Sequence, residues 1–75
     1  MIKNIVVIAE MSPYKGVVPL KIVWEDGREY FIDKITDIRK VASTKGGGVG
    51  VRYTCKILGK EKYLFFNDNI WFIEI

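Results

Sequence analysis

The chain has 75 residues, 49% of them hydrophobic, and a net charge of +3, with one cysteine and no histidine. This length allows a single domain, residues 1–75, whose four Phe, four Tyr and two Trp can supply an apolar core. A lone cysteine excludes an internal disulfide, no Cys/His set exists for zinc, and histidine, the commonest general base, is missing. The composition therefore points to a non-enzymatic protein without metal or cofactor.

The apolar run near the N-terminus, Ile5–Ala9, resembles the start of a signal peptide but is too short for one. Such a segment needs roughly 7–15 apolar residues, and Glu10 follows at once. No stretch approaches the ~20 apolar residues of a membrane span. We expect a cytoplasmic protein that does not bind a membrane, with Ile2–Ala9 as its first strand.

The segment Leu20–Trp24 alternates along its length and predicts a strand. Asp26 and Gly27 follow it, and this dipeptide predicts a hairpin with a two-residue type I′ turn. In that register Val23 pairs with Tyr30.

Residues 33–43 permit two interpretations. Ile35, Ile38 and Val41 recur every three residues and fit a helical stripe loosely. The β-branched content of the segment favours a strand instead. We predict a bent or bulged strand, with a short helix over residues 36–43 as the alternative.

The segment Thr44–Lys56 begins with a glycine-rich loop and continues as a strand. It is not a phosphate-binding P-loop, because its lysine precedes the glycines and a strand follows them. The loop either merely connects two strands or offers backbone that a ligand approaches closely. The loop residues that would contact a ligand are Lys45, Gly46, Gly47 and Gly48.

The strand Val51–Ile57 alternates cleanly, which places Cys55 inside as a small core residue and Arg52 and Lys56 outside. Gly59-Lys60 predicts a type II′ turn. In that register Lys56 lies opposite Tyr63, and Thr54 lies opposite Phe65 on the same outer face.

A further turn at residues 67–69 and a last strand, Ile70–Ile75, complete six to seven short strands. This pattern predicts an all-β fold: a small antiparallel barrel, SH3-like or similarly partly open. Both chain ends are apolar strands, and pairing them would remove two free edges.

The charge is unevenly distributed. From Lys34 to Lys62 there are eight cations and two carboxylates, a net of +6, while the rest of the chain has a net of −3. Cations next to aromatic side chains are typical of small barrels that bind single-stranded nucleic acid. The hypothesis is therefore nucleic-acid binding through the glycine loop and an outer stripe of Arg52, Lys56, Tyr63 and Phe65.

Two alternatives stay open. In the first, the lysines are scattered and solvated, and the N-terminal segment or a second subunit covers Tyr63 and Phe65. In the second, the protein is an interaction or homo-oligomeric module that uses its sheet edges and exposed aromatic side chains, with Ile70–Ile75 as the natural surface.

Several short segments resemble a family of small uncharacterised bacterial proteins, chiefly from clostridia and their relatives. They are Pro19–Arg28, Ile32–Ile35, Asp37–Arg39, Lys45–Gly47, Arg52–Thr54 and Trp71-Phe72. The resemblance implies a short, single-domain, cytoplasmic bacterial protein, and it brings no established activity or site residues.

Overall fold

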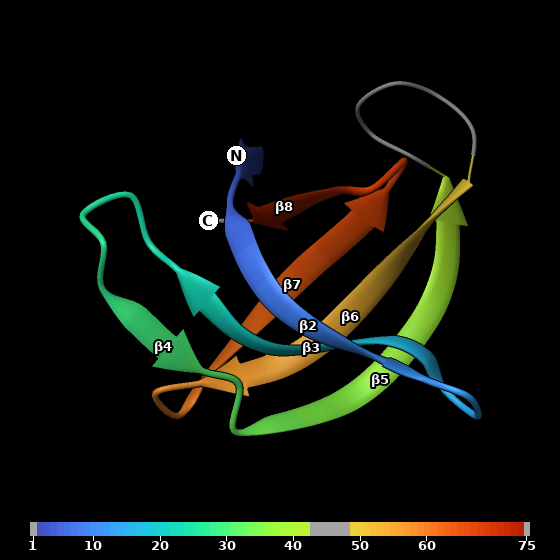
Figure 1. Cartoon of the computed structure of the whole chain (residues 1–75), viewed down its shortest axis with the longest axis horizontal. Coiled ribbons are helices and arrows are strands. Elements are labelled where there is room, and N and C mark those ends of the chain that lie inside the picture. Colours follow the sequence, from blue (N-terminus) through green and yellow to red (C-terminus); the bar gives the residue numbers. More distant parts are fainter. Residues whose placement is uncertain (1, 43–48, 75) are drawn as a thin grey trace.

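The computed structural model describes residues 2–42 and 49–74, and every regular element in them is a strand. The strands form two antiparallel sheets that lie one over the other, with β2 crossing the larger sheet steeply (Figure 1). They are β1 (Ile2–Asn4), β2 (Val6–Ser12), β3 (Gly16–Val23), β4 (Glu29–Phe31), β5 (Lys34–Ala42), β6 (Val49–Ile57), β7 (Lys60–Asn67) and β8 (Ile70–Glu74). The all-β prediction is confirmed, but the described strands number eight rather than six to seven and do not close into a barrel.

The larger sheet has the order β1-β8-β7-β6-β5 and the smaller one the order β2-β3-β4. The predicted pairing of the two terminal strands is confirmed, because β1 pairs with β8. This pairing places β8 inside the sheet, so the expectation that Ile70–Ile75 offers a free edge is wrong. The edges within the described chain are β1, β5, β2 and β4.

The chain passes from one sheet to the other at two corners. At the first corner the Ile5 amide donates to the Trp71 carbonyl at 3.1 Å, between β1 and β2. At the second, between β4 and β5, the Ile32 amide donates to Leu20 and the Asp33 amide to Lys56. Each corner residue thus keeps a backbone hydrogen bond where the strand changes partners.

The core lies between the facing sides of the two sheets. A hydrogen bond of 2.6 Å from the Tyr53 hydroxyl to the Val17 carbonyl links the two layers. The Tyr53 ring also packs against Trp71, with ring centroids 5.4 Å apart. The buried cluster comprises Ile22, Tyr53, Cys55, Ile57, Leu64, Trp71 and Ile73.

The β3–β4 hairpin differs from its predicted form by one residue. The Gly27 amide donates to the Trp24 carbonyl, and the Trp24 amide donates to the Arg28 carbonyl, so the loop has three residues with Gly27 at φ +88°. Such a loop is a type I turn followed by a left-handed glycine. The shift places Tyr30 opposite Ile22, and Tyr30 therefore packs on the core.

The β6–β7 turn is formed by Leu58 and Gly59, not by Gly59-Lys60. Both turn residues have positive φ, 54° and 75°, as a type I′ turn requires. Each β6 residue consequently faces a β7 residue two positions earlier than predicted. A two-residue shift preserves the faces, so the predicted inner and outer sides of β6 and β7 are correct.

The region in doubt, residues 33–43, is a strand. β5 runs from Lys34 to Ala42 with an irregularity between Ile35 and Asp37, where Thr36 has no partner in the register. The bulged-strand prediction is confirmed and the helix alternative is wrong. No helix among the described residues has the length and apolar character needed to cross a membrane.

Candidate nucleic-acid interface

The outer face of the larger sheet carries a row of cations beside a row of aromatic side chains. Arg39, Arg52, Phe65 and Phe72 are successive partners across β5, β6, β7 and β8. Directly opposite residues of an antiparallel pair share a face, so the row is continuous. We call this surface the cation–aromatic face; its members are Lys34, Arg39, Arg52, Lys56, Tyr63, Phe65 and Phe72.

Arg52 is the central residue of this face. Its guanidinium carbon lies 5.4 Å from the centroid of the Tyr63 ring, within the range of a cation–π contact. Its Nε is buried and has no hydrogen-bond partner among the described residues. A buried donor of this kind costs about 1–3 kcal/mol when it is left unpaired.

Like charges face each other twice across β5 and β6. Arg39 lies opposite Arg52, and Lys34 lies opposite Lys56. Such pairs destabilise a sheet. Asp37 relieves the first pair, because its carboxylate accepts a hydrogen bond of 2.7 Å from Arg39 Nε. The arrangement favours an anionic partner over this half of the face.

Tyr63 contacts both a cation, Arg52, and a carboxylate, Glu61. Its hydroxyl donates to Glu61 Oε1 at 2.9 Å. This hydrogen bond and the charge of Glu61 raise the pKa of the Tyr63 phenol, while nearby Arg52 lowers it. The phenol therefore stays neutral near pH 7 and offers an uncharged ring for stacking.

The four predicted strand residues do share one face, but their neighbours are not those predicted. Lys56 faces Glu61 instead of Tyr63, and Phe65 faces Arg52 instead of Thr54. Arg52, Tyr63 and Phe65 are half-buried and Lys56 is exposed. The predicted loop residues Lys45, Gly46, Gly47 and Gly48 lie outside the described residues.

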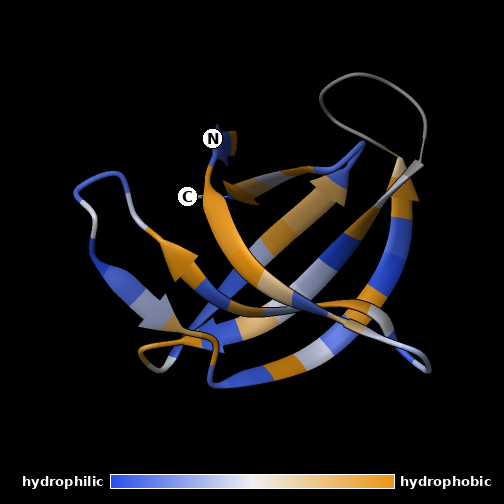
Figure 2. Ribbon diagram, viewed as in Figure 1, coloured by the Kyte–Doolittle hydropathy of each residue, from blue (hydrophilic) through white to orange (hydrophobic). Residues whose placement is uncertain are grey.

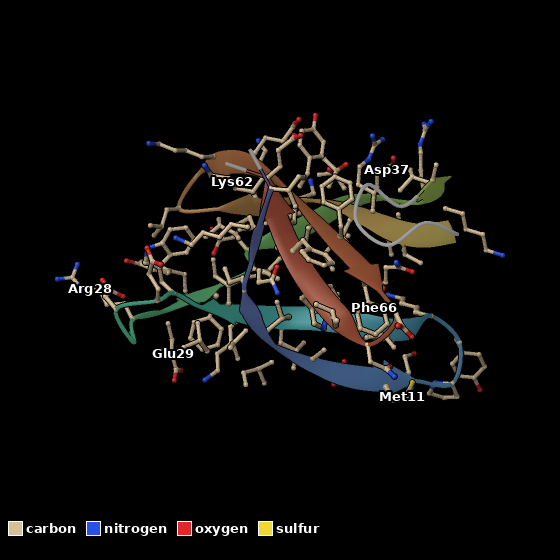
Figure 3. All side chains as sticks on the ribbon, turned by 90° about the horizontal axis from the view of Figure 1, so that it is seen from above. Met11, Arg28, Glu29, Asp37, Lys62 and Phe66 are labelled. Carbon is tan, nitrogen blue, oxygen red and sulfur yellow. The ribbon has the colours of Figure 1, made fainter. Side chains whose placement is uncertain are left out.

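The N-terminal segment does not cover these aromatic side chains. β1 extends the larger sheet at its far edge, and β2 belongs to the other sheet. Asp37 on β5 and Met11 on β2 lie on opposite sides of the molecule (Figure 3). Within the described chain, the alternative in which Ile2–Ala9 buries Tyr63 and Phe65 is therefore wrong.

The structure adds Lys34, Arg39 and Phe72 to the site. The alternation of β5 alone gave no signal for Lys34 and Arg39, because the bulge at Thr36 changes which residues point outward. Phe72 joins the face through its pairing with Phe65. Phe72 is buried although it does not belong to the core cluster between the sheets.

The positive charge of the segment Lys34–Lys62 is less concentrated on one face than the sequence indicates. Lys40, Lys60 and Lys62 face Val51, Ile57 and Cys55, which places them on the inner side of the sheet. The cation–aromatic face itself has four cations. Three carboxylates lie on the same outer side of the sheet, namely Asp37, Glu61 and Glu74. Its positive half is the β5–β6 half.

Cys55 is a buried core residue and not an exposed nucleophile. Cys55 is fully buried, its Sγ donates to the Lys62 carbonyl at 3.5 Å, and burial raises the pKa of its thiol to about 11. Such a thiol is protonated at neutral pH and is a poor nucleophile. The described residues contain no group of His, Cys, Asp or Glu that could hold a metal ion.

No family model matches the chain, and comparison with curated proteins and with solved structures finds no significant similarity. The resemblance to small bacterial proteins stays a prediction.

Proposed function

We propose that this protein is a non-enzymatic module that binds single-stranded nucleic acid on the cation–aromatic face. The observation that carries the proposal is Arg52, which lies over the Tyr63 ring and opposite both Arg39 and Phe65. Single-strand binders combine cations that follow the backbone with aromatic rings on which bases stack. The β5–β6 half supplies the first, and β7 supplies the second through the half-buried rings of Tyr63 and Phe65.

Salt dependence and strand preference test the proposal. Fluorescence anisotropy with labelled single- and double-stranded oligonucleotides should give tighter binding of the single strand and a linear loss of log affinity with log salt. Phe65→Ala should cost about 1–3 kcal/mol for the single strand, the value of one stacked base. Arg52→Ala and Lys56→Ala should weaken binding uniformly across sequences, each reducing the salt slope by about 1.

Arg28→Ala is the matched control, because it removes the same charge from an exposed turn of the other sheet. It should leave affinity and slope almost unchanged. If neither oligonucleotide binds at low salt, or if Arg28→Ala is as harmful as Arg52→Ala, the proposal fails.

The alternative function is self-association through a sheet edge, and one observation favours it. β2 is an edge strand of seven residues with Glu10 as its single charge, and Val6, Ile8 and Met11 on it are exposed. Figure 2 shows the apolar character of its first half. Proteins usually protect such an edge with charges, proline or short length. A dimer that does not respond to salt would support this alternative over nucleic-acid binding.

We further infer that the two sheets together form a partly open barrel of the SH3-like type. The support is that both β1–β2 and β4–β5 bend from one sheet into the other, at Ile5 and at Ile32-Asp33. Such corners let one sheet face remain open for a ligand.

A further inference from the structure

An apolar cleft of about 240 Å³ opens at one end of the space between the two sheets. Three core residues line it, Ile22, Ile57 and Ile73, together with the half-buried aromatic side chains of Trp24 and Tyr30. It is separate from the cation–aromatic face, since Ile22 and Ile57 belong to the core between the sheets.

Two lysines interrupt the apolar inner side of β7 at this cleft. Leu64 and Phe66 continue that side, but Lys60 and Lys62 precede them and line the cleft. Lys62 faces the fully buried Cys55 and is itself half-buried. A charged side chain at an inward position of a strand breaks the alternation that packing alone would select.

Neither lysine ammonium forms an ion pair within the described part of the chain. Glu74 also lines the cleft, and it lies opposite Tyr63 in the register, a position on the outer face. The cleft thus combines two cations, one carboxylate and an apolar interior, which is the environment that suits a ligand with a single negative charge.

We propose that this cleft binds a small organic anion made of one aromatic ring and one carboxylate. Trp24 and Tyr30 offer aromatic surfaces for the ring, and Lys62 and Lys60 bind the carboxylate. A cavity of about 150 Å³ holds a benzene molecule, so this volume accommodates one ring with a short substituent. The ligand is either a free aromatic acid or the C-terminal aromatic residue of a peptide.

An NMR titration of the full chain with phenylacetate, phenylacetamide and phenethylamine tests the charge requirement. Phenylacetate should shift the indole N–H signal of Trp24 saturably and leave that of Trp71, which does not line the cleft, almost unmoved. The neutral amide should bind about tenfold more weakly, as expected for the loss of a charge-assisted hydrogen bond. The amine should not bind.

Variants then assign the cations. Lys62→Met should weaken phenylacetate binding about fivefold or more and bring its affinity close to that of the amide. Lys15→Met, in the exposed turn between β2 and β3, is the control and should leave binding unchanged. Unshifted signals elsewhere in the spectrum show that each variant is folded.

Equal affinities for the acid and the amide, an unchanged affinity in Lys62→Met, or no saturable shift up to about 10 mM phenylacetate would overturn the proposal. Glycylphenylalanine and its C-terminal amide distinguish the two sources of the ligand. Tighter binding of the dipeptide than of phenylacetate identifies a protein C-terminus, and the reverse order identifies a free acid. Because Lys62 lies outside the cation–aromatic face, this result is independent of any oligonucleotide binding.

Discussion

At the scale of single residues, Cys55 shows how burial turns a reactive group into a packing group. Its side chain is fully buried and its Sγ contacts the Lys62 carbonyl. Burial disfavours the thiolate and raises the pKa of the thiol from 9.0 to about 11. The alternation of Val51–Ile57 was sufficient to predict this role, because one inward position in a regular strand fixes the rest.

The raised pKa of Cys55 predicts a loss of stability at alkaline pH. The folded-state pKa lies above the unfolded value, so the contribution is complete below pH 9 and is lost as the pH rises to about 11. The loss should amount to about 3 kcal/mol. Urea unfolding should therefore show that the stability advantage of the wild type over Cys55→Ala shrinks across this range. Parallel pH profiles of the two proteins would contradict the assignment.

Arg39 and Lys34 show what single-residue patterns could not reveal. Their place on the cation–aromatic face depends on the register of β5 against β6, and residues 43–48 separate these two strands in the chain. Nothing in the alternation of either strand fixes that register. The bulge at Thr36 then changes which side chains face outward, so the like-charged pairs become visible only in the folded sheet.

At the scale of elements, the exact turn residues determine whether the predicted register of a hairpin is correct. The two hairpins predicted from a glycine, β3–β4 and β6–β7, were located correctly. In each of them the glycine has positive φ and is the last residue of the loop. The β6–β7 error was two residues and left the faces intact, whereas the β3–β4 error was one residue and exchanged Tyr30 and Phe31. Hairpin existence is therefore easier to predict than register, because several turn types accept the same glycine.

Leu58 provides a prediction at this scale. It adopts φ 54° in a type I′ turn, a conformation that costs an ordinary residue about 1–2 kcal/mol, and its side chain is largely exposed. Leu58→Asn gives the preferred Asn-Gly turn and should stabilise the protein by about 1 kcal/mol. For a domain of this size the melting temperature should rise by roughly 4–8 °C.

Leu58→Ala is the matched control, because it removes the same side chain without favouring positive φ. It should give no gain in melting temperature. If the asparagine and alanine variants melt at the same temperature, backbone strain at Leu58 does not limit stability.

At the scale of the whole molecule, the four sheet edges are protected unequally. β1 and β4 have three residues each, and β5 carries Lys34, Asp37, Arg39 and Lys40. β2 has neither short length nor several charges. Two surfaces of the molecule therefore differ in chemistry. The cation–aromatic face of the larger sheet suits anions, whereas the β2 edge of the smaller sheet suits apolar contact. The two functions proposed above divide along this difference.

Self-association should therefore depend on β2 and not on apolar exposure in general. Ile8 on β2 and Ile70 on β8 are similarly exposed, at 43% and 46%, but only Ile8 belongs to an edge strand. If a dimer forms by antiparallel pairing of β2 with its copy, Ile8→Lys should weaken it about tenfold or more, because it places like charges near the twofold axis. Ile70→Lys should leave the dimer intact. Sedimentation equilibrium over a concentration series measures both. A wild-type protein that stays monomeric at the highest concentration, or equal effects of the two lysines, would exclude the β2 interface and leave the cation–aromatic face as the binding surface to pursue.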